Sequence, residues 1–199
     1  MTSRLRLVLA SANPKKVAEI RWVLGDAVDL APRPADIPDV VEDADTFVGN
    51  ARLKAVAIAD ATGEPALADD SGLVVDALDG EPGVRSARYA GEAHDDAANV
   101  AKLLVALDGV PPEQRTARFV AVALVRWPDG RELVAEGTVE GHIIDEVRGT
   151  DGFGYDPVFV PVDRDDGLTF AELSRPDKHA ISHRGRSLRA LLAQLTPPV

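Results

Sequence analysis

The stretch RLRLVLASANPKKVAEIRWVLG, residues 4–25, decides the fold class, because a short apolar segment runs directly into an amphipathic one. Residues 5–10 are mostly apolar and predict a buried strand. Residues 14–24 then place apolar side chains at helical spacing, and Gly25 is a typical helix stop. The apolar stripe of this predicted helix consists of Val17, Ile20 and Leu24. A strand followed at once by a helix is the unit from which α/β proteins are built.

The rest of the chain continues this alternation. Further helices are predicted over residues 47–63, 95–107 and 186–195, and further strands over residues 65–68, 73–78, 118–127, 132–139 and 158–161. A Pro-Asp-Gly turn at residues 128–130 joins two of these strands in a hairpin, whereas proline and aspartate crowd residues 32–45 and predict a loop. Together these elements predict an α/β fold with a mixed sheet flanked by helices.

The composition of the 199-residue chain excludes several classes of protein. The chain has no cysteine, so disulfide scaffolds, zinc–thiolate sites, iron–sulfur clusters and cysteine nucleophiles are ruled out. The length predicts a single domain spanning residues 1–199. The net charge of −11 argues against a nucleic-acid partner and favours a small anionic ligand bound through metal ions.

No segment predicts membrane insertion or export. The longest apolar run, residues 119–125, is far shorter than the ~20 residues that a membrane helix needs. The N-terminal apolar run, residues 7–10, is shorter than the roughly 7–15 apolar residues of a signal peptide. We therefore expect a cytoplasmic protein with no membrane partner.

The first candidate site is the segment at the predicted start of the first helix. It comprises Ser11, Ala12, Asn13, Pro14, Lys15 and Lys16. Asn13 suits the N-cap and Pro14 the first helical position, so free backbone N–H groups and the helix dipole would favour an anion here. The two lysines add positive charge. An ordinary helix start with two solvated lysines fits the same letters, and the Walker sequence GxxxxGK[ST] is not present.

The second candidate site is Asp69-Asp70-Ser71-Gly72, which follows the strand predicted over residues 65–68. Two adjacent carboxylates beside a buried strand need neutralising, and Mg²⁺ favours one or two carboxylates together with substrate phosphates. One of the carboxylates would also accept a proton from an attacking water. The alternative is an acidic turn, in which Gly72 adopts a left-handed conformation and Asp69 caps the next element.

The third candidate site combines the glycine-rich residues 152–157 with the basic residues 178–186. Glycines on both sides of Phe153 let a ligand approach the backbone and leave the aromatic ring available for stacking. The basic segment supplies the cations Lys178, His183, Arg184 and Arg186. The alternatives are a buried phenylalanine in a turn and a basic helix entry that is solvated or paired with acidic neighbours. Together, the three candidate sites supply the parts of a nucleoside triphosphate site.

Six segments then carry a resemblance to a known family. They are SANPKK (11–16), TFVGNARLKA (46–55), ADDSGL (68–73), PGVRSARYAG (82–91), GFGYDPVF (152–159) and AISHRG (180–185). In this order they resemble the inosine/xanthosine triphosphate pyrophosphatases, the Ham1 or RdgB-like group, from about Leu7 to Leu195. Two departures stand out. Ser11-Ala12 replaces the usual Thr-Gly, and Val41-Glu42-Asp43 stands where the family often has paired glutamates.

The resemblance implies two lobes with a central active-site cleft, usually in a homodimer. It also implies Mg²⁺-dependent hydrolysis of aberrant purine nucleoside triphosphates (ITP, dITP, XTP) to the monophosphate and pyrophosphate, which removes them from the nucleotide pool. By position, residues 11–16 would hold the phosphates, Asp70 would be the general base and a metal ligand, and Glu42 would be a second metal ligand. The remaining substrate contacts implied are Ser71, Phe153, Gly154, Tyr155, Asp156, Lys178, His183 and Arg184.

Selectivity is expected from the edge of the base. Hypoxanthine and xanthine carry an acceptor oxygen at position 6, where adenine carries an amino donor. Donors from Arg184 or from backbone N–H groups would satisfy the oxygen, and Phe153 would stack on any purine. Three other hypotheses fit parts of the sequence. The protein could be a Maf-like pyrophosphatase or nucleotidyltransferase, or a non-catalytic nucleotide- or RNA-binding module using residues 178–186. The third hypothesis is a structural protein whose motifs are turns and caps.

Overall fold

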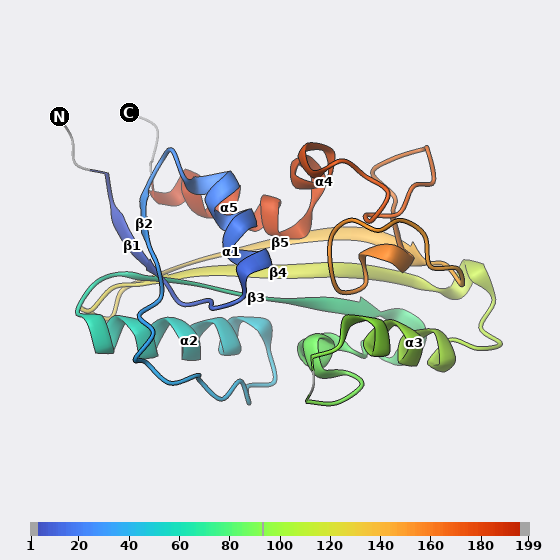
Figure 1. The fold of residues 1–199 in the computed structure, drawn as a ribbon, viewed down its shortest axis with the longest axis horizontal. Coiled ribbons are helices and arrows are strands. Elements are labelled where there is room, and N and C mark those ends of the chain that lie inside the picture. Colours follow the sequence, from blue (N-terminus) through green and yellow to red (C-terminus); the bar gives the residue numbers. More distant parts are fainter. Residues whose placement is uncertain (1–3, 93, 196–199) are drawn as a thin grey trace. The chain divides into compact units, whose positions relative to one another are not determined.

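The computed structural model describes residues 4–92 and 94–195 and shows helices alternating with strands (Figure 1). The strands are β1 (Arg6–Leu9), β2 (Asp29–Ala31), β3 (Ala66–Val75), β4 (Thr116–Arg126), β5 (Glu132–Ile143) and β6 (Phe159–Pro161). The α-helices are α1 (Pro14–Leu24), α2 (Phe47–Thr62), α3 (Asp96–Ala106), α4 (Arg175–Ile181) and α5 (His183–Leu195). In the described parts of the chain, no helix has both the length and the apolar character needed to cross a membrane.

The strands form one six-stranded mixed sheet in the order β2-β1-β3-β4-β5-β6. β1 runs parallel to both β2 and β3, whereas β5 and β6 run antiparallel. The expectation of an α/β fold with a mixed sheet is therefore confirmed.

The chain divides into two compact units. Unit 1 holds the described parts of Met1–Asp70, Ala121–Gly137 and Arg184–Val199, and unit 2 holds Ser71–Val120 and Thr138–His183 except the undescribed residue 93. The strands β3, β4 and β5 contribute residues to both units.

Alternation along β1 explains how unit 1 packs. Successive strand side chains point to opposite faces of a sheet, so Leu7 and Leu9 lie on one face and Val8 on the other. Leu7 and Leu9 belong to a core that includes apolar residues of α1 and α5, such as Ile20 and Leu188. Val8 belongs to a second core built with α2, through Ala51, Ala55 and Ile58. The sheet of unit 1 therefore buries both of its faces.

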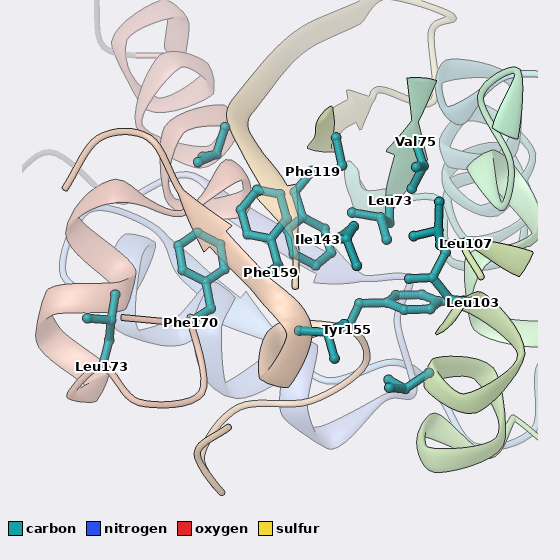
Figure 2. Close-up of a cluster of buried hydrophobic side chains, with 14 residues drawn as sticks. Leu73, Val75, Leu103, Leu107, Phe119, Ile143, Tyr155, Phe159, Phe170 and Leu173 are labelled. Atoms are coloured by element: carbon teal, nitrogen blue, oxygen red, sulfur yellow. The ribbon is translucent and has the colours of Figure 1, made fainter. Parts of the chain in front are cut away.

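Unit 2 has its own core, centred on aromatic rings (Figure 2). The ring centroid of Phe119 lies 4.7 Å from that of Phe159 and 5.8 Å from that of Phe170. Leu103 of α3 and Leu107, the residue that follows this helix, are buried in the same cluster. This core fixes the loops that carry the third candidate site.

Local signals predicted most element boundaries. α1 spans residues 14–24 as expected, with Asn13 as N-cap, and α2 ends at Gly63, which adopts a left-handed φ of 67°. The hairpin formed by β4 and β5 is also confirmed. By contrast, β2 and α4 were not predicted, and α5 begins at His183 rather than at residue 186.

The expected strand break at Asp69-Asp70-Ser71-Gly72 is wrong. β3 runs without interruption from Ala66 to Val75. Gly72 is not among the described residues with positive φ, so the alternative of an acidic turn fails as well. The physical reason is that cations from other elements neutralise the two carboxylates within the strand. These cations are Lys16, Lys54 and Arg184.

Candidate functional site

The paired carboxylates of β3 point to opposite faces of the sheet. Asp69 follows Leu67 by two residues and shares its face, toward α1 and α5, whereas Asp70 follows Ala68 and shares its face, toward α2. Both carboxylates are buried, Asp69 at 2% and Asp70 at 5% relative exposure. Two neighbouring carboxylates therefore contact different cations.

Asp69 is neutralised by two cations of unit 1. Its Oδ2 accepts a hydrogen bond of 3.1 Å from Arg184 Nε and lies 3.3 Å from Lys16 Nζ. Arg184 is itself almost completely buried and also pairs with Glu19 of α1. Burial by itself would raise the pKa of Asp69, but the charges of Lys16, Arg184 and Lys54 outweigh it and lower that pKa well below its usual range.

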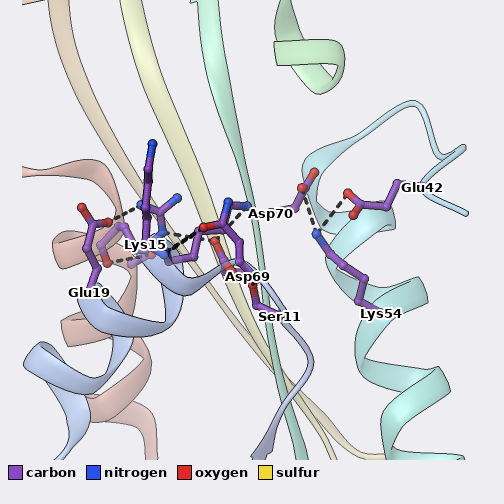
Figure 3. A network of polar contacts seen from close by, with 11 residues as sticks. Ser11, Lys15, Glu19, Glu42, Lys54, Asp69 and Asp70 are labelled. Atoms are coloured by element: carbon purple, nitrogen blue, oxygen red, sulfur yellow. Dashed lines mark hydrogen bonds and ion pairs between the residues drawn. The ribbon is translucent and has the colours of Figure 1, made fainter. Parts of the chain in front are cut away.

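Asp70 faces a different cation. Lys54 Nζ, from α2, lies 3.1 Å from Asp70 Oδ1 and 3.1 Å from Glu42 Oε2, so that one ammonium bridges two carboxylates (Figure 3). Burial raises the pKa of Asp70; Lys54 opposes this shift, and the nearby Glu42 carboxylate adds to it. A carboxylate with a raised pKa is a better base for abstracting a proton from water than an ordinary aspartate.

The start of α1 forms as predicted, although its amides are engaged. The Asn13 side chain accepts hydrogen bonds from the backbone N–H groups of Lys15, at 2.9 Å, and Lys16, at 3.3 Å. The Asn13 N–H donates to Ser11 Oγ at 3.2 Å. An anion here would therefore rely on the helix dipole and the lysine ammonium groups rather than on these three amides. Ala12, Asn13, Pro14 and Lys15 are exposed, which leaves the segment accessible.

Glu42 and Asp70 fit the role of ligands for a divalent cation. Asp70 Oδ2 is buried and, within the described part of the chain, has no hydrogen-bond partner, so this oxygen can take a ligand without losing a bond. Two carboxylate oxygens are the donors that Mg²⁺ commonly takes from a protein when substrate phosphates and water complete its shell. No group of three or more carboxylate, histidine or cysteine side chains placed to hold a metal occurs among the described residues.

The third candidate site lies in unit 2 as far as His183, whereas Arg184 and Arg186 belong to unit 1. In unit 2, one buried carboxylate organises the site. Asp156 Oδ2 accepts a hydrogen bond from the Phe153 N–H at 2.7 Å and another from Lys178 Nζ at 2.6 Å. The Lys178 ammonium also lies 4.9 Å from the centroid of the Phe153 ring. Asp156 therefore sets the position of both an aromatic ring and a cation. Lys178 is buried, so the basic segment is not the solvated face that one reading of the sequence allowed.

Two of the other predicted contacts in unit 2, Tyr155 and His183, have buried side chains that contact buried residues. The Tyr155 hydroxyl donates to the Ser86 carbonyl at 2.9 Å, and burial raises the pKa of Tyr155. The His183 ring stacks on Phe119, with centroids 4.6 Å apart. Ser71 is half-buried, and Gly154 adopts a left-handed φ of 63°. Tyr155 and His183 would therefore reach a ligand through their backbone more readily than through their side chains.

Sequence reasoning assigned no role to Lys54 or Glu19, and it treated Asp69 only as one of two adjacent carboxylates or as a cap of the next element. Lys54 lies in the segment TFVGNARLKA and Asp69 in the acidic pair Asp69-Asp70, so both residues belong to segments that the sequence had already singled out. Glu19 lies one helical turn after Lys16, a spacing that puts both on one side of α1. The signal that was missed is charge balance: the buried Arg184 of α5 and the partly buried Lys16 of α1 and Lys54 of α2 face the carboxylates of β3.

The chain is similar to known proteins along nearly its whole length. The model of the Ham1 family matches residues 7–194. The dITP/XTP pyrophosphatase of Desulforamulus reducens is 51% identical over 93% of this chain and 92% of its own length. That of Nitratidesulfovibrio vulgaris is 50% identical over 96% of this chain and 95% of its own.

The fold is also similar to that of solved structures. A HAM1 protein from Coxiella burnetii superposes with a TM-score of 0.89 at 42% identity, covering 98% of this chain and all of that one. The dITP/XTP pyrophosphatase from Mycobacterium abscessus gives a TM-score of 0.77 at 45% identity, covering 96% of this chain and all of that one. Since both the family model and these relatives span nearly the whole sequence, the chain belongs to the Ham1 family.

Proposed function

We propose that this protein hydrolyses dITP, XTP and ITP to the nucleoside monophosphate and pyrophosphate, thereby removing aberrant purines from the nucleotide pool. The observation that carries the proposal is the buried Asp70 carboxylate, which faces Glu42 across one ammonium and keeps one oxygen without a hydrogen bond in the described structure. Close relatives named as dITP/XTP pyrophosphatases support the substrate class.

The family resemblance implies two lobes with a central active-site cleft, and one nucleotide would bind in that cleft. Its triphosphate would bind the segment 11–16 and its base would bind around Phe153. The support for this placement is the resemblance to the family, whose motifs these residues match.

The chemistry assigned to the chain's own residues is a single displacement at phosphorus. Asp70 orients a water and takes its proton as the water oxygen bonds to the α-phosphorus. The bond from the α-phosphorus to the bridging oxygen breaks, and pyrophosphate leaves with that electron pair. Lys16 and the N-terminal end of α1 offset the charge of the departing group. Mg²⁺ held by Glu42 and Asp70 would neutralise further phosphate charge.

Recognition of the base would combine stacking with a hydrogen bond. Phe153, held by Asp156, would stack on the purine. Arg184 was expected as one source of the donor to the position-6 oxygen, but its guanidinium is buried against Asp69 and Glu19. We therefore assign this donor role to backbone N–H groups at the start of α5. A site built around that bond discriminates against adenine by up to ~10⁴-fold.

The test is a Mg²⁺-dependent assay of ITP, XTP, dITP, GTP and ATP, with phosphate and pyrophosphate detected separately. We expect pyrophosphate from the first three without any acceptor, and kcat for Asp70→Asn lower by ~10²–10⁴-fold. Asp60→Asn, an exposed change of the same charge on α2, is the control and should retain normal turnover. Near-normal turnover by Asp70→Asn would remove its assignment, and a need for an acceptor would indicate a nucleotidyltransferase.

We also propose a cytoplasmic homodimer, on the family resemblance alone. Light scattering of the purified protein should then give twice the chain mass of 21.1 kDa. A mass equal to that of one chain would exclude the dimer and leave the proposed chemistry untouched.

A further inference from the structure

The Lys54 ammonium contacts both of the carboxylates that are assigned to the metal. It lies 3.1 Å from one oxygen of Asp70 and 3.1 Å from one oxygen of Glu42 (Figure 3). The Lys54 side chain is only 12% exposed, so little solvent screens these contacts. The protein thus supplies its own positive charge to this pair of carboxylates.

Simultaneous occupation of the pair by Lys54 and a divalent cation is unfavourable. A metal bonded to Asp70 would lie close to the ammonium that contacts Oδ1, even when it took Oδ2, the oxygen of the same carboxylate that has no hydrogen-bond partner in the described structure. Like charges repel strongly where solvent is largely excluded. Lys54 can yield, because its charge is carried at the end of a flexible four-carbon stem. The backbone beneath it stays fixed, since Ala51 and Ala55 of α2 are completely buried.

We propose that Lys54 is a resident cation that competes with the divalent metal for Glu42 and Asp70. Metal binding then requires Lys54 to leave the pair. A polyphosphate beside the pair provides Lys54 with another anion, so nucleotide and metal each strengthen the binding of the other. This inference rests on the proposed function, and it adds that nucleotide-free enzyme holds metal weakly.

The alternative is that Lys54 is a fixed counter-ion with no influence on the metal. The two roles differ in what happens when its charge is removed. A competitor suppresses metal binding, so its removal tightens binding; a fixed counter-ion outside the metal's reach leaves binding unchanged. Arg52 offers a matched control, because it lies on the same helix, carries the same charge and instead pairs with Glu132 at 3.0 Å.

The experiment measures Mn²⁺ binding to nucleotide-free protein by the electron paramagnetic resonance signal of the free ion. We expect Lys54→Met and Lys54→Gln to bind Mn²⁺ at least about tenfold more tightly than the natural protein, and Arg52→Met to change by less than about threefold. Lys54→Arg, which restores the charge, should restore weak binding. The glutamine variant keeps a polar group near the carboxylates and so provides the measurement should Lys54→Met fail to fold.

A second measurement adds a nucleotide analogue in which a methylene group replaces the oxygen between the α- and β-phosphorus. It should tighten Mn²⁺ binding to the natural protein, and do so much less in Lys54→Gln. Equal Mn²⁺ affinity in the natural protein, Lys54→Gln and Arg52→Met would overturn the inference. Because no turnover is measured, a protein that hydrolyses ITP normally could still fail this test, and an inactive one could still pass it.

Discussion

Asp69 shows how one buried charge depends on partners from other elements. Its carboxylate is held by Arg184 and Lys16, and Arg184 is held in turn by Glu19. Removing one partner of a buried ion pair leaves uncompensated charge in a poorly solvated place, which is more costly than losing an exposed pair. The stability of unit 1 should therefore depend strongly on this residue.

Asp69→Asn should lower the free energy of unfolding by about 3–5 kcal/mol at neutral pH. The folded protein releases the Asp69 proton at lower pH than the unfolded chain, whose carboxyl has the ordinary pKa of 3.8, so the stabilisation is present above that pH and lost below it. Urea unfolding at several pH values measures both effects. In the variant, the loss of stability below pH 3.8 should be shallower; an unchanged profile contradicts the assignment, and Asp60→Asn is the exposed control.

Phe153 is expected to contact the substrate through its aromatic face alone. Since every purine has such a face, Phe153→Ala should raise KM for ITP, XTP and dITP by similar factors, with stacking contributing about 1–3 kcal/mol per base. Steady-state kinetics on the three substrates provides the measurement. A change confined to one of them would show that the side chain reads the edge of the base instead.

At the scale of elements, the glycine-rich loop before η4, a 3-10 turn at Asp156–Val158, imposes the tightest constraint. Gly152 and Gly154 both have left-handed φ angles, of 78° and 63°. A Cβ at Gly152 would collide with the Asp156 carboxylate, whereas one at Gly154 would meet nothing within 4 Å. The two positions therefore separate backbone strain from loss of the Asp156 contacts.

Gly154→Ala should cost about 1–2 kcal/mol, the usual penalty for a left-handed alanine. Gly152→Ala should cost more, because it also drives Asp156 away from Phe153 and Lys178. Denaturant unfolding gives the two free energies, and KM for ITP reports the base site. Equal effects of the two substitutions would show that Asp156 does not organise this loop.

The helices and strands differ in how well the sequence predicts them. α1 and α2 were predicted because their boundaries are written locally, in the caps Asn13 and Gly63. β3 was mispredicted because its polar residues are neutralised by Lys16, Lys54 and Arg184, which are distant in sequence. α4 was missed although Ser174 caps it, since a helix of seven residues shows little periodicity.

In the candidate site too, the sequence predicts what depends on neighbouring residues and misses what depends on distant ones. Motif order pointed to Asp70, Phe153 and the residues around them, because such motifs consist of neighbours in the chain. The partners of these residues come from other elements, and only the folded chain shows that Glu19 holds Arg184 or that Asp156 holds Phe153. Residue types were thus predictable, whereas pairings were not.

For the whole molecule, the metal should matter to catalysis and not to folding. Among the described residues, three apolar clusters and buried ion pairs stabilise the units, and neither Glu42 nor Asp70 belongs to a cluster. EDTA should therefore abolish hydrolysis while leaving the far-UV circular dichroism and the midpoint of thermal unfolding within about 2 °C of their values in Mg²⁺. Unfolding on chelation would instead identify a structural metal, and excess Mg²⁺ should restore activity.

The uninterrupted course of β3 has a consequence for how the chain can change over time. Because Asp69 and Asp70 serve opposite faces, inserting or deleting one residue between Leu67 and Asp70 reverses the parity of the strand. The carboxylates would then point to the opposite face of the sheet. Asp69 would lose Lys16 and Arg184, and Asp70 would lose Lys54. Length variation among descendants of this sequence should accordingly fall elsewhere, for instance in the irregular segment of residues 32–45.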